Sequence, residues 1–361
     1  AEYKSMRIRE ATESDKPAWD NFVNTQGGMF HQYYDWKQVY QAVGQSFFPL
    51  MIEDDKSELV GIFSLVREDH KFYSLLFGAG FKSVLFRNPV PSDRKYEITS
   101  AVIKYVEENY ASRCATFLIN DQLPVGYKEE QDRALIDSGF RIRYNKETGL
   151  PCSHVLPLES PFEEKIWKGL WSQKLRQALN KVEKRGIVVI QDRDLKYVEE
   201  YVKNVIANYK RHGHQPPGRE FLITAFKVFK NNTKLFVALD RGQPVALLSC
   251  IYTPSTCYLW EIGTPGKETA DVNKYCYKIA IQDACNAGYK YVDFLGSYTV
   301  GLASLKKRFG TQQTPIMVYE KRYSAPRVLL RYGPLVVKYI FQDRKYIWEN
   351  KSKIWDAIRR W

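Results

Sequence analysis

The sequence predicts an α/β protein made of two similar halves, each with a mixed sheet, followed by an amphipathic C-terminal helix. One observation is length, because 361 residues are more than a single hydrophobic core usually holds. The other is that one order of elements (strand, two helices, three strands, helix, strand) occurs twice along the chain. We expect domains over residues 1–155 and 156–325 and a helical tail over 326–361.

Corresponding segments justify each element in turn. A strand and an amphipathic helix are predicted in "MRIREATESDKPAWDNFV" and again in "GIVVIQDRDLKYVEEYVKNVI". A second helix follows in "YDWKQVYQAVGQ" and in "REFLITAFKVFKN", and three strands with a polar first turn follow each of these. Each half then closes with a helix and an apolar strand. In the second of these helices apolar residues recur every three or four positions, and Gly288 supplies the stop.

Composition narrows the partners but does not choose one. The net charge of +13 favours an anionic partner: tRNA or another nucleic acid, a nucleotide-linked substrate, CoA, or an anionic membrane face. No apolar run approaches the ~18 residues of a membrane span, and the first residues lack the apolar core of a signal peptide. We therefore expect a cytoplasmic protein whose six cysteines, which include no CxxC pair, are free thiols.

The stretch "YVDFLGSYTVGLASLKKRFG", residues 291–310, leads from an apolar strand into three consecutive cations. A solvated helix face would explain such a run. A position at the carboxyl end of a strand, where open α/β sheets bind their ligands, favours a functional site instead.

Four segments taken in order carry a family resemblance: "MFHQYYDW", "WSQKLRQALNKVEKRGIVV", "NKYCYKIAIQDACNAGYKYVDFLGS" and "GLASLKKRFG". Over about residues 5–322 the chain resembles the FemABX family of tandem GNAT transferases and its BioF2-like acetyltransferase relatives. The resemblance implies two GNAT-like domains of the acyl-CoA N-acyltransferase fold. It also implies an aminoacyltransferase or peptidyltransferase that takes its donor from aminoacyl-tRNA. The acceptor would be an amine on a peptide or on a nucleotide- or lipid-linked molecule.

The turns before the central helices bear on which acyl donor the protein uses, because they lack a glycine-rich pyrophosphate-binding pattern. A GNAT domain that binds acetyl-CoA usually opens its central helix with a glycine-rich turn whose N–H groups receive the pyrophosphate. The turn "IGTPGKETADVN" lacks that pattern and carries Glu268 and Asp271, and "RNPVPSDR" lacks it too. We expect no bound cofactor, with aminoacyl-tRNA as donor co-substrate and acyl-CoA or an acyl carrier protein as the alternative.

The resemblance also implies a catalytic lysine. Attack by an amine on an acyl ester needs positioning, stabilisation of the oxyanion and removal of a proton. The family's basic Phe-Lys-x-x-Phe-Gly type sequence aligns with residues 305–310, which makes Lys306 the oxyanion-stabilising residue. Ser297 at the strand end and Arg308 are predicted to contact substrate beside it.

No general base stands out, but two carboxylates lie on the relevant strands. Asp293 is read either as a buried hydrogen-bond acceptor that orients the adjoining loop or as a substrate contact. Glu261, on the third strand, could meet an incoming ammonium group or be structural. Asn273 and Tyr277 face the same side of the central helix, and Asn273 could tie down the adjoining loop.

Further cations and a tyrosine are predicted to contact substrate. Arg176, on an amphipathic helix, could neutralise a phosphate or lie on a solvated face. Tyr209 and Arg211 match a region in which the family uses Tyr and Arg on its acceptor, and Lys37 aligns loosely with a family lysine near the acceptor. The H-x-H pair His212 and His214 lacks further ligands, so no metal is expected.

The remaining motifs exclude several enzyme classes and leave two readings of the tail. There is no G-x-S-x-G, no P-loop and no G-x-G-x-x-G after a strand, which argues against ATP and dinucleotide chemistry.

Residues 338–361 form an amphipathic pattern with seven Lys/Arg and three Asp/Glu, a charge of +4. This helix would either touch the inner face of an anionic membrane or dock on the protein. A non-catalytic RNA- or membrane-binding protein on the same fold is the third functional reading.

Overall fold

The predicted order of elements is present in both halves of the computed structural model, which describes residues 6–81, 84–123, 132–143, 151–212, 214–266, 270–297 and 300–331. The first half comprises β1 (Arg7–Glu10), α1 (Lys16–Thr25), α2 (Trp36–Gln41), β2 (Ser46–Glu53), β3 (Leu59–Asp69), β4 (Ser74–Gly78), β5 (Leu85–Phe86), α3 (Ser92–Tyr110), β6 (Cys114–Gln122), α4 (Arg133–Asp137) and β7 (Arg141–Ile142). The second comprises β8 (Cys152–Pro157), a π-helix η3 (Glu163–Lys168), α5 (Gln173–Lys184), β9 (Val188–Asp192), α6 (Val198–Arg211), α7 (Arg219–Val228), β10 (Thr233–Asp240), β11 (Gln243–Tyr252), β12 (Thr256–Gly263), α8 (Ala270–Asn286), β13 (Tyr291–Ser297), α9 (Val300–Lys307) and β14 (Gln312–Arg322). Single-turn 3-10 helices lie at Glu13–Asp15, Phe30–Gln32 and Lys230–Asn232.

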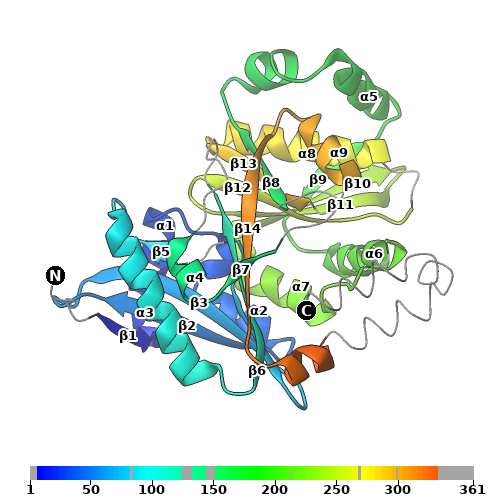
Figure 1. Cartoon of the computed structure of the whole chain (residues 1–361). Helices are drawn as coiled ribbons and strands as arrows, with labels where there is room; N and C mark the ends of the chain where they lie inside the picture. The colour runs from blue at the N-terminus through cyan, green and yellow to red at the C-terminus, as the bar shows by residue number, and fades with distance from the viewer. Residues whose placement is uncertain are drawn as a thin grey trace, which may run out of the picture.

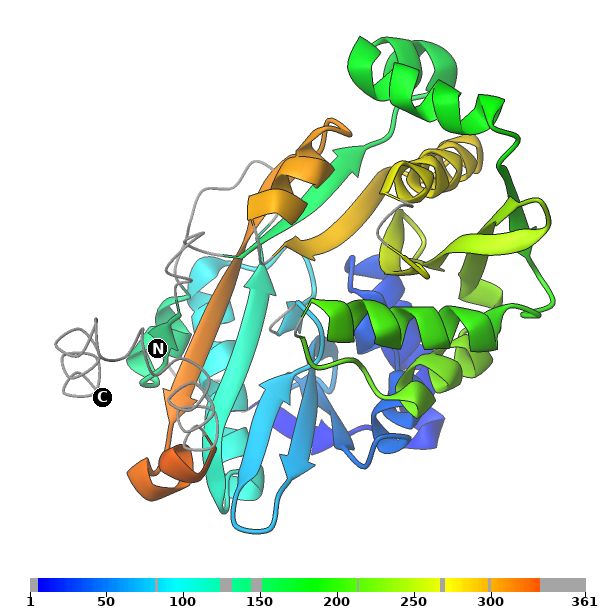
Figure 2. The ribbon, with the colours of Figure 1, turned by 90° about the vertical axis from the view of Figure 1, so that its right-hand side faces the viewer.

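One mixed sheet runs through both halves in the order β1-β2-β3-β4-β6-β14-β8-β13-β12-β11-β10-β9. Neighbours in each half are antiparallel except β4 with β6 and β12 with β13, which are parallel because a helix crosses over between them. The long strand β14 joins the halves: residues 312–315 pair with β8 and residues 316–322 pair with β6 (Figures 1 and 2).

Helices cover both faces of each half of the sheet, so strand residues of both orientations are buried. In β2, Leu50 and Ile52 pack toward α3, while Met51 between them packs toward α1. In the second half, α8 and α5 cover one face and α6 and α7 cover the other (Figure 1). Each helical layer thus stands over a continuous apolar surface.

An aromatic cluster fixes the two halves against each other. Trp36 is fully buried, and its ring centroid lies 5.2 Å from that of Phe229 and 6.0 Å from those of Phe221 and Trp260. Helix α2 thereby packs against α7 and β12 of the other half. Leu295, at the end of β13, belongs to the same cluster.

The structure also bears on the predictions about the cysteines, membrane-spanning helices, domain boundaries and C-terminal tail. None of the six cysteines, all of them among the described residues, forms a disulfide, and Gly288 ends α8 with a φ of +82°. No described helix is long and apolar enough to cross a membrane. The boundary predicted at residue 155 falls inside β8, and β14 serves both halves, so the division into 1–155 and 156–325 stays a prediction. Residues 332–361, which hold most of the predicted tail, lie outside the described residues.

Candidate active site

Strands β12 and β13 separate at the point where the predicted site residues gather. The pairing covers only three residue pairs and stops at Tyr258 and Asp293, although both strands continue in the part of the chain that the structure describes. Each has an irregularity at that point. In β12 the register against β11 shifts at Trp260, which brings Trp260 and Glu261 to the same face. In β13 the register against β8 shifts after Asp293, and Leu295 has a φ of +59°.

Lys306 lies at this end of β13. Its side chain is buried, and its ammonium donates to the carbonyl oxygens of Phe294 at 2.7 Å, Leu295 at 3.0 Å and Gly296 at 2.8 Å. Burial lowers the pKa of Lys306 to about 8, while the charges of Asp293 and Glu261 oppose that fall. The oxyanion role implied by the resemblance would require one of these carbonyls to be exchanged for a substrate oxygen, because an ammonium has three donors.

Asp293 is buried where four strands meet. Its carboxylate accepts from Ser153 Oγ at 2.6 Å, from Gln122 Nε2 at 3.1 Å and from the backbone N–H of Leu295 at 2.7 Å. Gln122 also donates to Thr314 Oγ1 at 3.2 Å. Burial raises the pKa of Asp293, and these hydrogen bonds oppose the rise. Asp293 is thus a buried hydrogen-bond acceptor, and its role as a substrate contact stays a prediction.

Glu261 is a carboxylate poised to change its charge. Tyr209 Oη, on α6, donates to Glu261 Oε1 at 2.6 Å, and Oε2 has no hydrogen-bond partner among the described residues. Burial raises the pKa of Glu261 to about 7, although the bond from Tyr209 and the charge of Lys306 lower it. A carboxyl group with a pKa near neutrality and a free oxygen can accept a proton from an amine.

Three more predicted residues lie on the elements around this site. Tyr277 is buried with its ring 5.5 Å from Phe294, and its pKa is raised by burial and by Glu261. Ser297 Oγ and Asn273 Oδ1 are buried, and neither has a hydrogen-bond partner among the described residues. The predicted tie from Asn273 to the adjoining loop stays a prediction, because residues 267–269 of that loop lie outside the described residues.

The remaining predicted cations do not contact Lys306 or Glu261 through any hydrogen bond or ion pair of the described residues. Arg211 donates to the carbonyl of Thr264, one residue after β12. Lys37 forms an ion pair with Glu13 in the first half. Arg308 is exposed, and Arg176 is half-buried on α5. No hydrogen bond or ion pair within the described ranges joins Lys37, Arg176 or Arg308 to Lys306 or Glu261.

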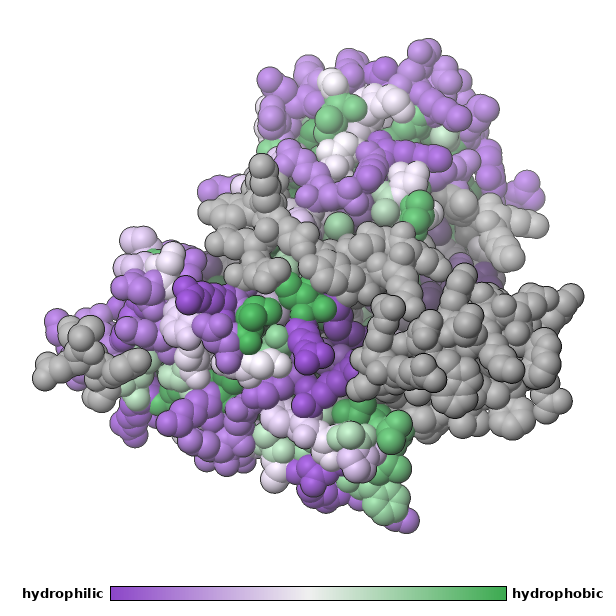
Figure 3. All heavy atoms as spheres, viewed as in Figure 1, coloured by the Kyte–Doolittle hydropathy of each residue, from purple (hydrophilic) through white to green (hydrophobic). Residues whose placement is uncertain are grey.

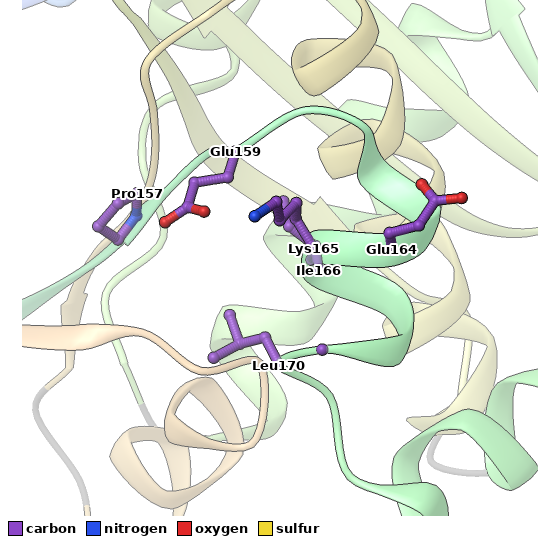
Figure 4. A pocket seen from close by; sticks show the side chains of 7 residues that line it. Pro157, Glu159, Glu164, Lys165, Ile166 and Leu170 are labelled. Carbon is purple, nitrogen blue, oxygen red and sulfur yellow. The ribbon is translucent and has the colours of Figure 1, made fainter.

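A small pocket of about 200 Å³ lies apart from these residues, between the end of β8 and η3. Figure 4 shows Glu159 and Glu164 on either side of Lys165 there, with Leu170 below. None of the predicted site residues lines it. The described residues also contain no cluster of His, Cys, Asp or Glu arranged to hold a metal ion.

Sequence reasoning missed the polar residues that join the two halves at Asp293. Gln122, Ser153 and Thr314 are ordinary strand residues that lie 171, 140 and 21 positions from Asp293 along the chain, and no motif marks them. Only the pairing of β14 with both β6 and β8 brings them together.

The comparisons agree with this architecture. A crystal structure of FemX superposes with a TM-score of 0.69 at 14% identity, over 90% of this chain and 99% of that one. The chain has a FemABX-type tandem GNAT fold. Residues 172–303 match the family model of an acetyltransferase (GNAT) domain, which supports the prediction of an acyltransferase.

Two further solved structures superpose on the chain. The C-terminal domain (DUF2156) of a putative lysylphosphatidylglycerol synthetase from Agrobacterium fabrum gives a TM-score of 0.55 at 10% identity, covering 90% of this chain and 96% of that one. A tandem GNAT protein from the clavulanic acid biosynthesis pathway gives 0.50 at 8% identity, covering 88% and 98%. No curated protein matches the sequence significantly.

Proposed function

We propose that the protein is an aminoacyltransferase or peptidyltransferase that moves an aminoacyl group from aminoacyl-tRNA to an amine on a peptide or cell-envelope acceptor. The observation that supports this most directly is Glu261, with a pKa of about 7, at the point where β12 and β13 no longer pair with each other. In the reaction the amine nitrogen attacks the ester carbonyl. A C–N bond forms, the C–O bond to the tRNA breaks, and Glu261 passes the amine proton to the departing oxygen.

A basic surface of the second half supports a polyanionic donor. It consists of Lys174, Lys181 and Lys184 on α5 together with Lys307 and Arg308 at the end of α9, all exposed. None of the five forms an ion pair with any described residue, and the one carboxylate of α5, Glu183, pairs with Lys278 at 3.7 Å. Unneutralised cations of this kind attract phosphates.

The two parts of the basic surface are held together by packing. Trp171 Nε1 donates to the carbonyl of Phe309 at 2.9 Å, and the two rings meet edge to face at 5.3 Å. In Figure 3 the layer above the second sheet is largely hydrophilic, and amides such as Gln177 and Asn180 lie between the lysines of α5. Although Leu170, which is 46% exposed, lies against Gly310 between the two parts, a mostly hydrophilic surface that carries several cations favours an RNA backbone over a lipid interface.

Replacing Lys174, Lys181 and Lys184 together by Glu is expected to weaken tRNA binding about 10-fold or more near physiological salt. The loss of about three phosphate contacts would make the salt dependence of binding shallower by about two to three in log–log slope. The measurement is a binding titration with purified tRNA at several salt concentrations.

A matched control changes the charge equally on the first half, through Lys56→Glu, Lys95→Glu and Lys104→Glu. This variant should bind tRNA much more tightly than the α5 variant does. Equal weakening by the two variants would show that only net charge matters and that α5 does not dock RNA.

The reaction itself is tested by offering the purified protein two donors, radiolabelled aminoacyl-tRNA and radiolabelled acetyl-CoA, with amine acceptors of three kinds. The acceptors are a peptide, a nucleotide-linked peptide and an aminated lipid headgroup, and products are read by mass shift. Transfer from aminoacyl-tRNA alone supports the proposal, and transfer from acetyl-CoA alone overturns it.

Acyl-CoA or an acyl carrier protein is the second candidate donor, and the match of residues 172–303 to an acetyltransferase domain favours it. At the start of α8 the negative charge of Asp271 is paired with Lys274, so it opposes a diphosphate less than the sequence suggested. We place the reaction in the cytoplasm. Contact with the inner face of the membrane through residues 338–361 would suit a lipid-linked acceptor.

A further inference from the structure

The three carbonyl groups that surround Lys306 have an unusual arrangement. In a regular strand successive carbonyl groups point to opposite sides, so three in a row cannot reach one atom. Here the oxygens of Phe294, Leu295 and Gly296 all lie within 3.0 Å of Lys306 Nζ. The left-handed backbone of Leu295, with φ +59°, turns them to one side. This conformation is costly for a residue other than glycine and persists only where neighbouring groups enforce it.

The ammonium is chemically suited to enforce it. Three carbonyl dipoles that point at one spot repel one another unless a cation lies between them. Lys306 supplies that cation, and its three N–H donors match the three acceptors, so no proton remains for another partner. Its side chain is 6% exposed, whereas the neighbouring Lys307 is exposed and forms no ion pair with a described residue.

Asp293 holds the same turn through the backbone N–H of Leu295. That N–H donates to the Asp293 carboxylate, while the Leu295 carbonyl accepts from Lys306. Together the two side chains hold the segment that begins where β13 leaves β12 and ends where it resumes pairing with β8 at Gly296. The point of separation of the two strands therefore depends on this pair.

We propose that Lys306 is a positioning residue whose ammonium clamps the bulged end of β13 and so holds β12 and β13 apart, rather than facing the reacting oxygen. The inference rests on the proposed function in one respect, because the separated strand ends are the site assigned to transfer. Its test, however, needs no substrate.

The test is chemical rescue of the full-length Lys306→Ala variant, read by thermal unfolding. We expect a melting temperature about 4 °C or more below that of the unchanged protein, because three carbonyls lose their cation. Propylammonium, which replaces the lost atoms, should recover at least half of that loss. Tetramethylammonium has the same charge but no N–H donor, so it should recover none. The Lys307→Ala variant should keep the unchanged protein's melting temperature and should not respond to propylammonium.

If Lys306→Ala does not fold, Lys306→Met takes its place, because it keeps an aliphatic side chain and lacks the ammonium. We expect its melting temperature to lie below that of the unchanged protein. A Lys306→Ala protein that melts like the unchanged protein, or that responds equally to both ammonium ions, overturns the clamp. So does a variant in which propylammonium restores transfer but not stability, because that result assigns the ammonium to the oxyanion. A confirmed clamp in a protein that transfers from neither donor would instead overturn the proposed function alone.

Discussion

The Glu261→Gln variant is expected to lose about 10²–10⁴-fold in kcat/KM for amide formation, the usual contribution of a positioned proton acceptor. In the unchanged protein the rate should rise as the pH passes about 7, where Glu261 ionises, and fall above about 8, where Lys306 loses its charge. The variant should lack the rising limb and keep the falling one. A pH profile of kcat/KM for both proteins checks this.

The stability of the folded protein should depend on the ionisation of Glu261 in the opposite direction to the rate. Because the folded state raises the pKa of Glu261 above 4.5, the neutral carboxyl favours folding, and this contribution is lost as pH rises through about 7. Glu261→Gln should therefore be the more stable protein at pH 8, by at most about 3 kcal/mol, with a smaller difference at pH 5. Glu199→Gln removes an exposed carboxylate of α6 whose ion pair with Arg219 lies at the surface, so it should leave the rate unchanged and alter stability by less than about 1 kcal/mol. A Glu261→Gln protein with full activity would remove Glu261 from the chemistry.

The Trp36→Ala variant is expected to lose about 3–5 kcal/mol of unfolding free energy, the usual cost of deleting a fully buried large aromatic side chain. Trp36 contacts aromatic rings of both halves, so the cavity would open between them. Unfolding should also remain one transition, because β14 and the rest of the cluster still couple the halves. Denaturant unfolding followed by tryptophan fluorescence and by circular dichroism measures both points.

Phe72→Ala is the control for this prediction, since Phe72 is an aromatic residue that is 60% exposed. We expect it to change the unfolding free energy by less than about 0.5 kcal/mol. Two separate transitions in the Trp36→Ala protein would mean that the halves are only loosely coupled.

The order of elements could be read from the sequence because it depends on local patterns. Residues such as Leu50, Met51 and Ile52 are apolar in succession because both faces of their strand are covered, and the helices between the strands show the 3.6-residue period. The pairing of β14 with both β6 and β8 has no such local signal, so a division of the chain by sequence alone places a boundary inside β8.

Some features of the candidate site could likewise be predicted from the sequence, and others could not. The placement of Lys306 at a strand end followed from its distance from the strand and from the family resemblance. Its three carbonyl partners did not, because they depend on the left-handed conformation of Leu295, a residue type that rarely adopts it. Likewise Glu261 was recognised on its strand, whereas the shift of register at Trp260 that turns it toward Tyr209 is a tertiary feature.

The strand shared by the two halves constrains how the molecule can be taken apart. A fragment that ends near residue 155 would leave β6 without β14 from Thr116 to Gln122, and an open strand edge of that length invites aggregation. A fragment that begins there would carry residues 316–322 with nothing to pair against. Dissection of the two repeats by truncation should therefore yield insoluble material, whereas the halves expressed as separate chains in one cell could reassemble across that seam.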